Sequence, residues 1–363
     1  MTGFGSVWSA VWVVAVLAAQ LATAPPEPRE VVVSVGGPPT DPAYLPVHAA
    51  AALGTFEAEG LRVTLRRVRH PTAALEALRD AEVDVAVTSA DQAVRGGWGR
   101  GLPVQVLLAH TGAPAAMFLV STRHVGRVGR IEDLPGKRVG IPGPGTTGHL
   151  FLSALLAERR IEAWRVELLS FGGATLVARL DSGNLAAAIV EEPWATRALA
   201  QGAAEILFDF RQPEVVARYL GGPFYEVVSV ARAPETAEKG KKEAKAEPPA
   251  KDRAILEPAL TAFARAVIRV QHWLAATPAA EVVARLPADL VGDPERFVTR
   301  LQSAQRAYVP GGDATAQGLA TTLRVLRAGS PWPATLKVTP EALREPAFIT
   351  AARAALGPSP APP

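Results

Sequence analysis

The chain has 363 residues, with 38 Lys and Arg against 35 Asp and Glu, and it contains no cysteine. The length suits two lobes of ordinary domain size better than a single core. Because acidic and basic residues are interspersed, there is no basic stripe for nucleic acid, and without cysteine there can be no disulfide or thiolate metal site.

The N-terminal segment carries no charged side chain from Phe4 to Ala24 and ends in the small-x-small triplet 22–24. This pattern is typical of a secretory signal peptide, although Pro25 would follow the cleavage site and the start lacks Lys and Arg. Residues 1–24 are also about as long as a membrane span, so an uncleaved anchor is a second interpretation. A buried N-terminal helix is a third. The first two place the folded part in the periplasm or otherwise outside the cytoplasm.

A repeat with a spacing of about 102 to 103 residues relates residues 62–87 to residues 165–189. Arg62–Leu65 aligns with Arg165–Leu168, and Glu82–Val87 aligns with Asn184–Ile189. A helix-like segment lies between the two strands of each copy. Apolar strands bounded by turn residues are typical of a mostly parallel sheet with helices on both faces. We therefore predict an α/β protein with two similar halves.

Other segments complete these halves. Strands are expected at 31–35, 104–109, 116–121, 138–141, 206–208 and 226–231, and helices at 49–56, 72–79, 174–180, 254–276, 279–286, 293–307 and 314–328. Residues 235–253 contain six Lys or Arg and five Asp or Glu, with hardly an apolar side chain larger than Ala. They cannot bury enough surface to order themselves, so we predict a disordered insertion there. The Pro-rich C-terminal end is predicted to be a frayed tail.

A glycine-rich turn at 143–148 follows the strand at 138–141 and precedes a helix, and it matches G-x-G-x-x-G. A dinucleotide site also needs an acid at the end of the next strand, and Leu168–Phe171 has none at that position. A P-loop needs Lys and a hydroxyl where this chain has His149 and Leu150. What remains is a helix start with unpaired backbone N–H groups and a threonine cap, which would face a cleft and favour an anion or a polar acceptor. A purely structural turn is the alternative.

Patterns for catalysis or metal binding are scarce. The six histidines have no metal-ligand spacing, and there is no G-x-S-x-G motif. We therefore predict no metal site, no cofactor and no catalytic residue.

Four segments together resemble a known family. In chain order they are Leu53–Leu61 before a strand, Glu82–Val87 with Thr88 and Ser89, Leu134–Ile141 with its glycine turn, and Gly183–Pro193. Their order and spacing are similar to those of the extracytoplasmic substrate-binding proteins of ABC importers, in the branch that serves sulfonates, taurine, nitrate and pyrimidine precursors of thiamine. The likeness covers roughly residues 31–330.

This resemblance implies a two-lobed periplasmic-binding-protein type II fold, in which a mostly parallel sheet forms each lobe and a two-strand hinge joins them. The crossings would fall near 111–116 and 221–226, and closure of the lobes would present a liganded shape to the importer. The implied domains are 1–24 (signal peptide or anchor), 31–112 (lobe 1), 113–222 (lobe 2), 223–345 (return of lobe 1) and 346–363 (tail). The implied partners are a small-molecule solute and the permease subunits of an ABC importer, with the protein itself a monomer.

By position in that fold, nine residues are expected to bind the solute. They are Gly37, Tyr44, Thr88, Ser89, Thr146, Thr147, Gly148, Glu192 and Trp194. Three departures from the family pattern qualify this expectation, and the insertion at 235–253, which is unusual for the family, is the first. Ala186 stands where the family usually has an Asp, the counterpart of Asp84, and Glu191 with Glu192 would disfavour a bare anion and favour a cationic or zwitterionic solute.

The leading hypothesis is a non-catalytic binding protein that captures a small organic or oxyanion solute for an importer. One alternative is an enzyme on the same fold that converts a small molecule, for which only His149 and the pair Glu191 and Glu192 are candidates. The other is a membrane-anchored sensor module that retains residues 4–24.

Overall fold

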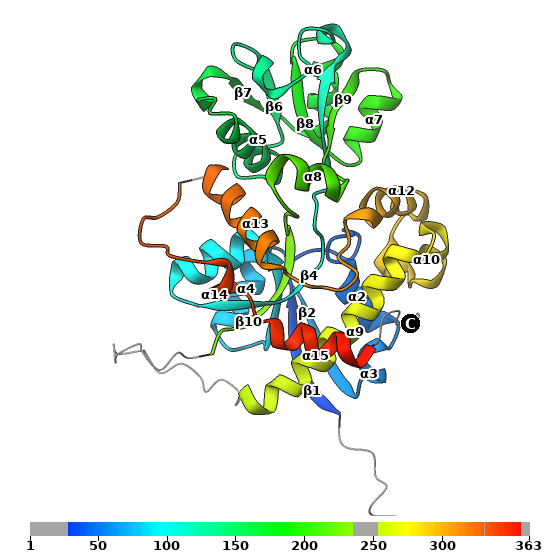
Figure 1. The fold of residues 1–363 in the computed structure, drawn as a ribbon. Coiled ribbons are helices and arrows are strands. Elements are labelled where there is room, and N and C mark those ends of the chain that lie inside the picture. The colour runs from blue at the N-terminus through cyan, green and yellow to red at the C-terminus, as the bar shows by residue number, and fades with distance from the viewer. Residues whose placement is uncertain (1–27, 235–252, 330, 357–363) are drawn as a thin grey trace, which may run out of the picture.

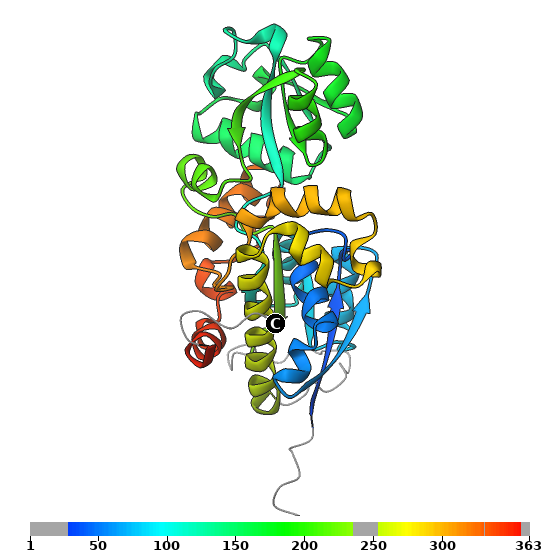
Figure 2. The same ribbon diagram turned by 90° about the vertical axis from the view of Figure 1, so that its right-hand side faces the viewer.

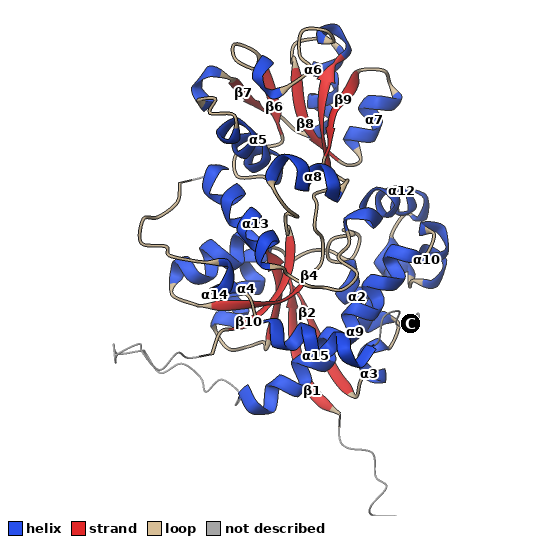
Figure 3. Cartoon of the chain, viewed as in Figure 1, coloured by secondary structure: helices blue, strands red, loops and turns tan. Residues whose placement is uncertain are grey.

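The computed structural model describes residues 28–234, 253–329 and 331–356. The chain forms two five-stranded sheets, one in each of two lobes stacked along the long axis of the molecule (Figure 1). The strand orders are β2-β1-β3-β10-β4 and β7-β6-β8-β5-β9. Helices cover the faces of both sheets (Figure 3), which is the α/β architecture that the apolar strands predict.

Lobe 1 contains the first sheet. Its strands are β1 (Arg29–Val35), β2 (Leu61–Arg67), β3 (Val85–Ser89), β4 (Val104–Ala109) and β10 (Val227–Arg232), and the helices between them are α2 (Leu45–Ala52), α3 (Thr55–Ala58) and α4 (Pro71–Arg79). β1 pairs in parallel with β2 and β3, whereas β10 is antiparallel to β3 and β4. Val31, Val33 and Val35 on β1 are fully buried, because alternate residues of a strand share one face and these three pack into a core with residues of α2 and α9.

Lobe 2 contains the second sheet. Its strands are β5 (Ala116–Ser121), β6 (Arg138–Ile141), β7 (Glu167–Ser170), β8 (Ala187–Glu191) and β9 (Ala204–Asp209), and its helices are α5 (Thr147–Glu158), α6 (Gly173–Asp181), α7 (Trp194–Ala200) and α8 (Pro213–Leu220). Here β5 is the antiparallel strand, between β8 and β9. Because β5 enters lobe 2 from lobe 1 and β10 returns from it, the chain crosses between the lobes twice.

The C-terminal third is helical. It consists of α9 (Arg253–Ala276), α10 (Ala279–Arg285), α11 (Ala288–Val291), α12 (Pro294–Ala304), α13 (Ala316–Gly329), α14 (Pro340–Leu343) and α15 (Pro346–Leu356). Figure 2 shows α9 running along lobe 1, beside the first sheet. No helix within the described residues is long and apolar enough to cross a membrane.

The repeat predicted from the sequence is confirmed. α4 begins at Pro71 and α6 at Gly173, and β3 begins at Val85 and β8 at Ala187, so both elements recur after 102 residues. The departure at Ala186 has a local explanation. In lobe 1, an Oδ2 atom of Asp84 accepts the backbone N–H of Val32 at 2.9 Å, which ties β3 to β1. Ala186 has no side-chain acceptor, and lobe 2 keeps only the backbone bond from Ala186 N–H to the Arg138 carbonyl.

Three segments differ from the expectations. The helix expected at 49–56 is two helices, because Gly54 adopts a left-handed φ of 70° between α2 and α3. The segment expected to be a tail from residue 346 begins with α15, which packs on α9 through buried Ile349 and Ala352. Helix α13, expected in lobe 1, packs against α5 of lobe 2, where a Cβ on Gly329 would lie 2.4 Å from Leu150.

The predicted signal segment and nearly all of the insertion at 235–253 lie outside the described residues.

Gly140 on β6 offers a test of packing in lobe 2. A Cβ at this position would lie 2.6 Å from Leu176, 2.7 Å from Leu185 and 3.0 Å from the Cβ of Ala188. We expect Gly140→Ala to lower the free energy of unfolding by about 1–3 kcal/mol, since the core must shift to admit one methyl group. Urea unfolding measures this change. Gly129→Ala, which meets no atom within 4 Å, is the matched control and should be close to neutral. Equal effects of the two changes would contradict the packing argument.

Candidate functional site

A pocket of about 600 Å³ lies between the two lobes. Lobe 1 contributes the loop after β1, the end of β3 and helix α12, and lobe 2 contributes the glycine turn and the end of β8. Both crossing segments also reach it. The lining residues are Pro38, Thr40, Asp41, Pro42, Ala43, Tyr44, Ser89, Asp91, Thr111, Ala113, Pro114, Ala115, Ala116, Gly145, Thr146, Thr147, Leu150, Glu191, Glu192, Pro193, Phe224, Glu226, Val227, Arg300, Ala304, Ala307 and Leu326. A solute held here would contact both lobes at once.

The loop after β1 forms the lobe 1 wall. Asp41 folds this loop by accepting the backbone N–H of Ala43 at 3.0 Å, and its own carbonyl accepts the N–H of Tyr44, which precedes α2. The Tyr44 ring lies against Gly37, where a Cβ would come within 2.3 Å of the ring. A ring nitrogen of His48 lies 3.1 Å from the Gly37 carbonyl. Gly37 therefore shapes the wall by letting the aromatic ring approach the backbone.

The end of β3 forms the next part of this wall. Thr88 is fully buried and donates its hydroxyl to the Pro71 carbonyl at 2.8 Å, so it fixes the start of α4. Ser89 lines the pocket, and its hydroxyl accepts the N–H of Gln92. Asp91, also at the pocket, forms an ion pair of 2.5 Å with Arg95 one helical turn later.

The glycine turn forms part of the lobe 2 wall. Thr146 is the N-cap of α5: its hydroxyl accepts the N–H of His149 at 3.4 Å and donates to the Gly143 carbonyl at 2.7 Å. Thr147 donates its hydroxyl to an Oε1 atom of Glu226 at 2.7 Å, which links α5 to the second crossing. Gly148 lies under the turn, where a Cβ would be 2.9 Å from Pro142. The turn therefore holds the crossing segment with one of its threonines.

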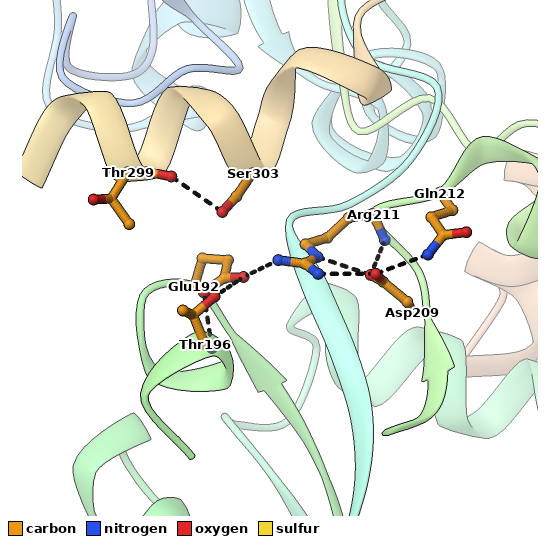
Figure 4. Close-up of polar contacts among 7 residues, drawn as sticks. All are labelled: Glu192, Thr196, Asp209, Arg211, Gln212, Thr299 and Ser303. Atoms are coloured by element: carbon orange, nitrogen blue, oxygen red, sulfur yellow. Dashed lines mark hydrogen bonds and ion pairs between the residues drawn. The ribbon is translucent and has the colours of Figure 1, made fainter. Parts of the chain in front are cut away.

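Glu192 belongs to a network of polar side chains (Figure 4). Its carboxylate accepts the N–H and the hydroxyl of Thr196 and pairs with Arg211 at 2.7 Å. Arg211 also binds both carboxylate oxygens of Asp209 at 2.8 Å, and Gln212 donates to the same carboxylate. Burial alone would raise the pKa of Asp209, but these hydrogen bonds hold it below its usual value. Figure 4 shows this network facing α12 of lobe 1.

The structure brings five of the nine expected site residues to the pocket and places four elsewhere. Those lining the pocket are Tyr44, Ser89, Thr146, Thr147 and Glu192, and those outside its lining are Gly37, Thr88, Gly148 and Trp194. Trp194 packs its ring over Gly173, where a Cβ would lie 2.1 Å from the indole, and over Arg197. The four outside the lining shape or support its walls.

Apart from Glu191, six polar residues of the pocket were not expected from the sequence. They are Thr40, Asp41, Asp91, Thr111, Glu226 and Arg300. Asp91 lies two residues after Ser89, and this closeness to an expected site residue was a usable signal. Glu226 lies in the predicted second crossing, and a residue at the hinge between two lobes can be expected to face the pocket between them. Arg300 comes from α12, and no sequence pattern places that helix beside the pocket.

Three carboxylates in the pocket are perturbed. Burial, followed by the charges of Asp41 and Glu191, raises the pKa of Glu226 to about 7, although its hydrogen bond from Thr147 opposes the shift. Burial, followed by the negative charge of Asp41, raises the pKa of Glu191. Burial also raises the pKa of Asp41, against the effects of the Ala43 N–H and of Arg300. The three groups repel one another, so they share one electrostatic environment.

Comparison with solved structures identifies the fold. A protein from Bordetella bronchiseptica RB50 is 23% identical, with a TM-score of 0.63 over 91% of this chain and 98% of that chain. The periplasmic aliphatic sulphonate binding protein SsuA from Escherichia coli is 17% identical, with a TM-score of 0.55 over 83% and 91%. The periplasmic nitrate-binding protein NrtA from Synechocystis PCC 6803 is 14% identical, with a TM-score of 0.55 over 92% and 90%. These likenesses confirm the two-lobed periplasmic-binding-protein fold.

A search of curated proteins found no match. The model of the NMT1-like family, in contrast, matches residues 24–212, which is more than half of the chain. The matched region runs from before β1 to just after β9 of lobe 2 and includes the repeat and the glycine turn. This chain therefore belongs to the NMT1-like family.

Proposed function

We propose that this protein is the solute-binding component of an ABC importer and captures a small solute between its two lobes outside the cytoplasm. The observation that carries the proposal is the pocket itself, because both lobes and both crossing segments contribute to its lining. Rotation of one lobe about the crossings would open or close such a site. The folds of the sulphonate-binding and nitrate-binding proteins support the same role.

Both crossing segments are held to lobe 1 by hydrogen bonds. In the first, Gln271 donates to the carbonyl of Ala109 at 2.9 Å, and the His110 N–H binds the Val227 carbonyl. In the second, the Glu226 carbonyl accepts the N–H of Ala90 in lobe 1, while its carboxylate binds Thr147 in lobe 2. The carboxylate contact between the lobes is a single hydrogen bond. Movement of the lobes would therefore break only one hydrogen bond of the Glu226 carboxylate, so this contact would not prevent opening and closing of the pocket.

Binding without catalysis is favoured by the placement of the candidate catalytic groups. The Nδ1 atom of His149 accepts the Gly145 N–H at 3.0 Å, and His149 is not among the residues that line the pocket. Glu192 is held by Arg211 and Thr196. Glu191 lines the pocket, but no nucleophile–base pair is formed between it and another candidate group within the described residues. The partner in this proposal is the permease of an importer.

A thermal-shift screen of the full chain tests the proposal. A solute present at 100 times its Kd should stabilise the protein by about 2.7 kcal/mol and raise Tm by roughly 5 °C. The screen should include amines, amino acids, sulfonates, nitrate and pyrimidines. Ala115→Trp, which places an indole in the pocket, should abolish the shift, whereas Ala157→Trp on the exposed face of α5 should preserve it. A shift that survives Ala115→Trp, or no shift with any solute, would count against the proposal.

A further inference from the structure

Three carboxylates from three separate parts of the chain face one pocket. Asp41 lies in the loop after β1 of lobe 1, Glu191 is the last residue of β8 in lobe 2, and Glu226 lies in the second crossing just before β10. Asp41 perturbs both of the others, and Glu191 perturbs Glu226, so the three charges lie within electrostatic reach of one another. The fold therefore concentrates negative charge where the lobes meet.

These three carboxylates differ from the other two in the lining. Asp91 is paired with Arg95, and Glu192 is paired with Arg211. Within the described residues, no ion pair is formed by Asp41, Glu191 or Glu226. Two of the five acids therefore have a basic side chain of the protein as an ion-pair partner, and the other three do not.

Arg300 is the single basic side chain in the pocket lining. Its guanidinium lowers the pKa of Asp41, but its Nη1 atom donates to the Thr40 carbonyl at 3.4 Å rather than to a carboxylate. Three carboxylates therefore face one guanidinium, so the pocket carries an excess of two negative charges when all three carboxylates are ionised. A bare anion such as a sulfonate or nitrate would add to this excess while losing its own hydration.

The arrangement does not suit a single metal ion. Among the described residues, no group of three or more His, Asp or Glu side chains is close enough together to hold one. The carboxylates are spread around the wall instead of converging on one point. Tyr44, Phe224, Leu150 and Leu326 lie among them and give the pocket apolar patches. A ligand that matched this lining would carry separated positive groups on a short apolar frame.

Thr111 is an independent observation that points to a polar ligand in this pocket. It lies in the first crossing, lines the pocket and is only 3% exposed, yet its hydroxyl oxygen has no hydrogen-bond partner. A buried polar atom without a partner costs about 1–3 kcal/mol. An ammonium group has donors for this oxygen as well as for carboxylates. Thr111 therefore adds a neutral acceptor to the charged ones.

Resting on the function proposed above, we propose that the solute is an organic cation with two separated positive nitrogen groups, such as a short diamine, held by Asp41, Glu191 and Glu226 with Thr111 as a further acceptor. Such a solute would join lobe 1, lobe 2 and the crossing segment through one molecule. It would also replace the mutual repulsion of the three carboxylates by attraction, so its binding energy would favour the closed arrangement of the lobes.

The test is isothermal titration of the full chain at pH 8 and low salt with putrescine, spermidine, taurine, ethanesulfonate and nitrate. We expect putrescine or spermidine to bind and the two anions to give no heat. The double variant Glu191→Gln and Glu226→Gln should weaken diamine binding at least 100-fold. Glu205→Gln, an exposed acid on β9 of lobe 2, is the matched control and should stay within twofold of the wild type.

The possible outcomes separate this inference from the proposed function. Binding of taurine, ethanesulfonate or nitrate without binding of a diamine would overturn the cationic solute while leaving the binding function intact. Diamine binding that is unchanged in the double variant would also overturn it, since the carboxylates would then not hold the ligand. If none of the five solutes binds and the broad thermal screen shows no shift, both the cationic solute and the proposed binding function would be contradicted.

Discussion

Replacing Arg211 by methionine is expected to lower the free energy of unfolding by about 3 kcal/mol. Arg211 is the shared partner of Asp209 and Glu192, whose side chains are only 10% and 6% exposed. Methionine keeps much of the volume but leaves both carboxylates in a poorly solvated place without their cation, and removing one partner of a buried pair typically costs 3–5 kcal/mol. Arg211 itself is 21% exposed, so we expect the lower end of that range. Urea unfolding at pH 7 gives the value.

Two comparisons make this result specific to the network. Arg62→Met breaks an ion pair with Glu30 in which the side chains are 66% and 68% exposed, and it should cost under about 0.5 kcal/mol. Adding Asp209→Asn and Glu192→Gln to the Arg211 variant should recover part of the loss, because the uncompensated charges are then gone. Equal costs for the Arg211 and Arg62 variants would refute a structural role for the network.

Glu226→Gln is expected to make the empty protein more stable at pH 8, by about 2–3 kcal/mol. The folded pKa of about 7 lies above the usual 4.5, so the native state holds a proton on this carboxyl that the unfolded chain releases. The stability that this proton contributes is complete below pH 4.5 and is lost as the pH rises through 7. Glutamine stays neutral at every pH and keeps an oxygen that can accept the Thr147 hydroxyl.

The variant should therefore equal the wild type near pH 4.5 and exceed it increasingly up to pH 8. Urea unfolding at pH 4.5, 6 and 8 measures the difference. Burial is the main cause of the raised pKa of Glu226; the hydrogen bond from Thr147 opposes it, and the charges of Asp41 and Glu191 add to it. Glu205→Gln at an exposed position should shift stability by under about 0.5 kcal/mol at all three pH values. A difference that does not grow with pH would show that Glu226 is not destabilised by its surroundings.

These two experiments distinguish two uses of acidic residues at the same pocket. The Glu192 carboxylate is neutralised inside the protein and stabilises lobe 2. Glu226 is held in a place that is unfavourable for its charge, which costs stability in the empty protein. Functional sites often lower the stability of the protein without its ligand, and binding of the ligand then removes the unfavourable interaction. On the proposal of a dicationic solute, the variant that stabilises the empty protein is also one that impairs binding.

The sequence alone was sufficient for most of the fold. Strands β4, β5 and β6 begin and end at the residues expected, because apolar runs bounded by Pro, Gly and charged residues carry a strong local signal. The repeat predicted two matching halves, and the halves match at the residue level between α4 and α6. The order of strands across each sheet was not predicted, since local pattern does not say which strands are neighbours.

The site was less accessible to prediction. The turn at Thr146 and Thr147 and the acids after β8 could be found because they sit at the ends of elements, where helix starts and strand ends meet at one edge of a sheet. Asp41 and Arg300 could not be found in this way. They are 259 residues apart in the sequence, and their meeting depends on how α12 packs on lobe 1.

The sequence by itself determined that this is a two-lobed α/β protein, because hydrophobic periodicity and turn residues act over a few positions. The tertiary structure decided which acids are paired and which are exposed to a ligand. Glu191 and Glu192 are adjacent and chemically alike, yet Arg211 reaches only Glu192, while Glu191 faces Asp41 and Glu226 across the pocket. Charge compensation depends on distances between atoms that are remote in sequence, and only the packing of the two lobes sets those distances.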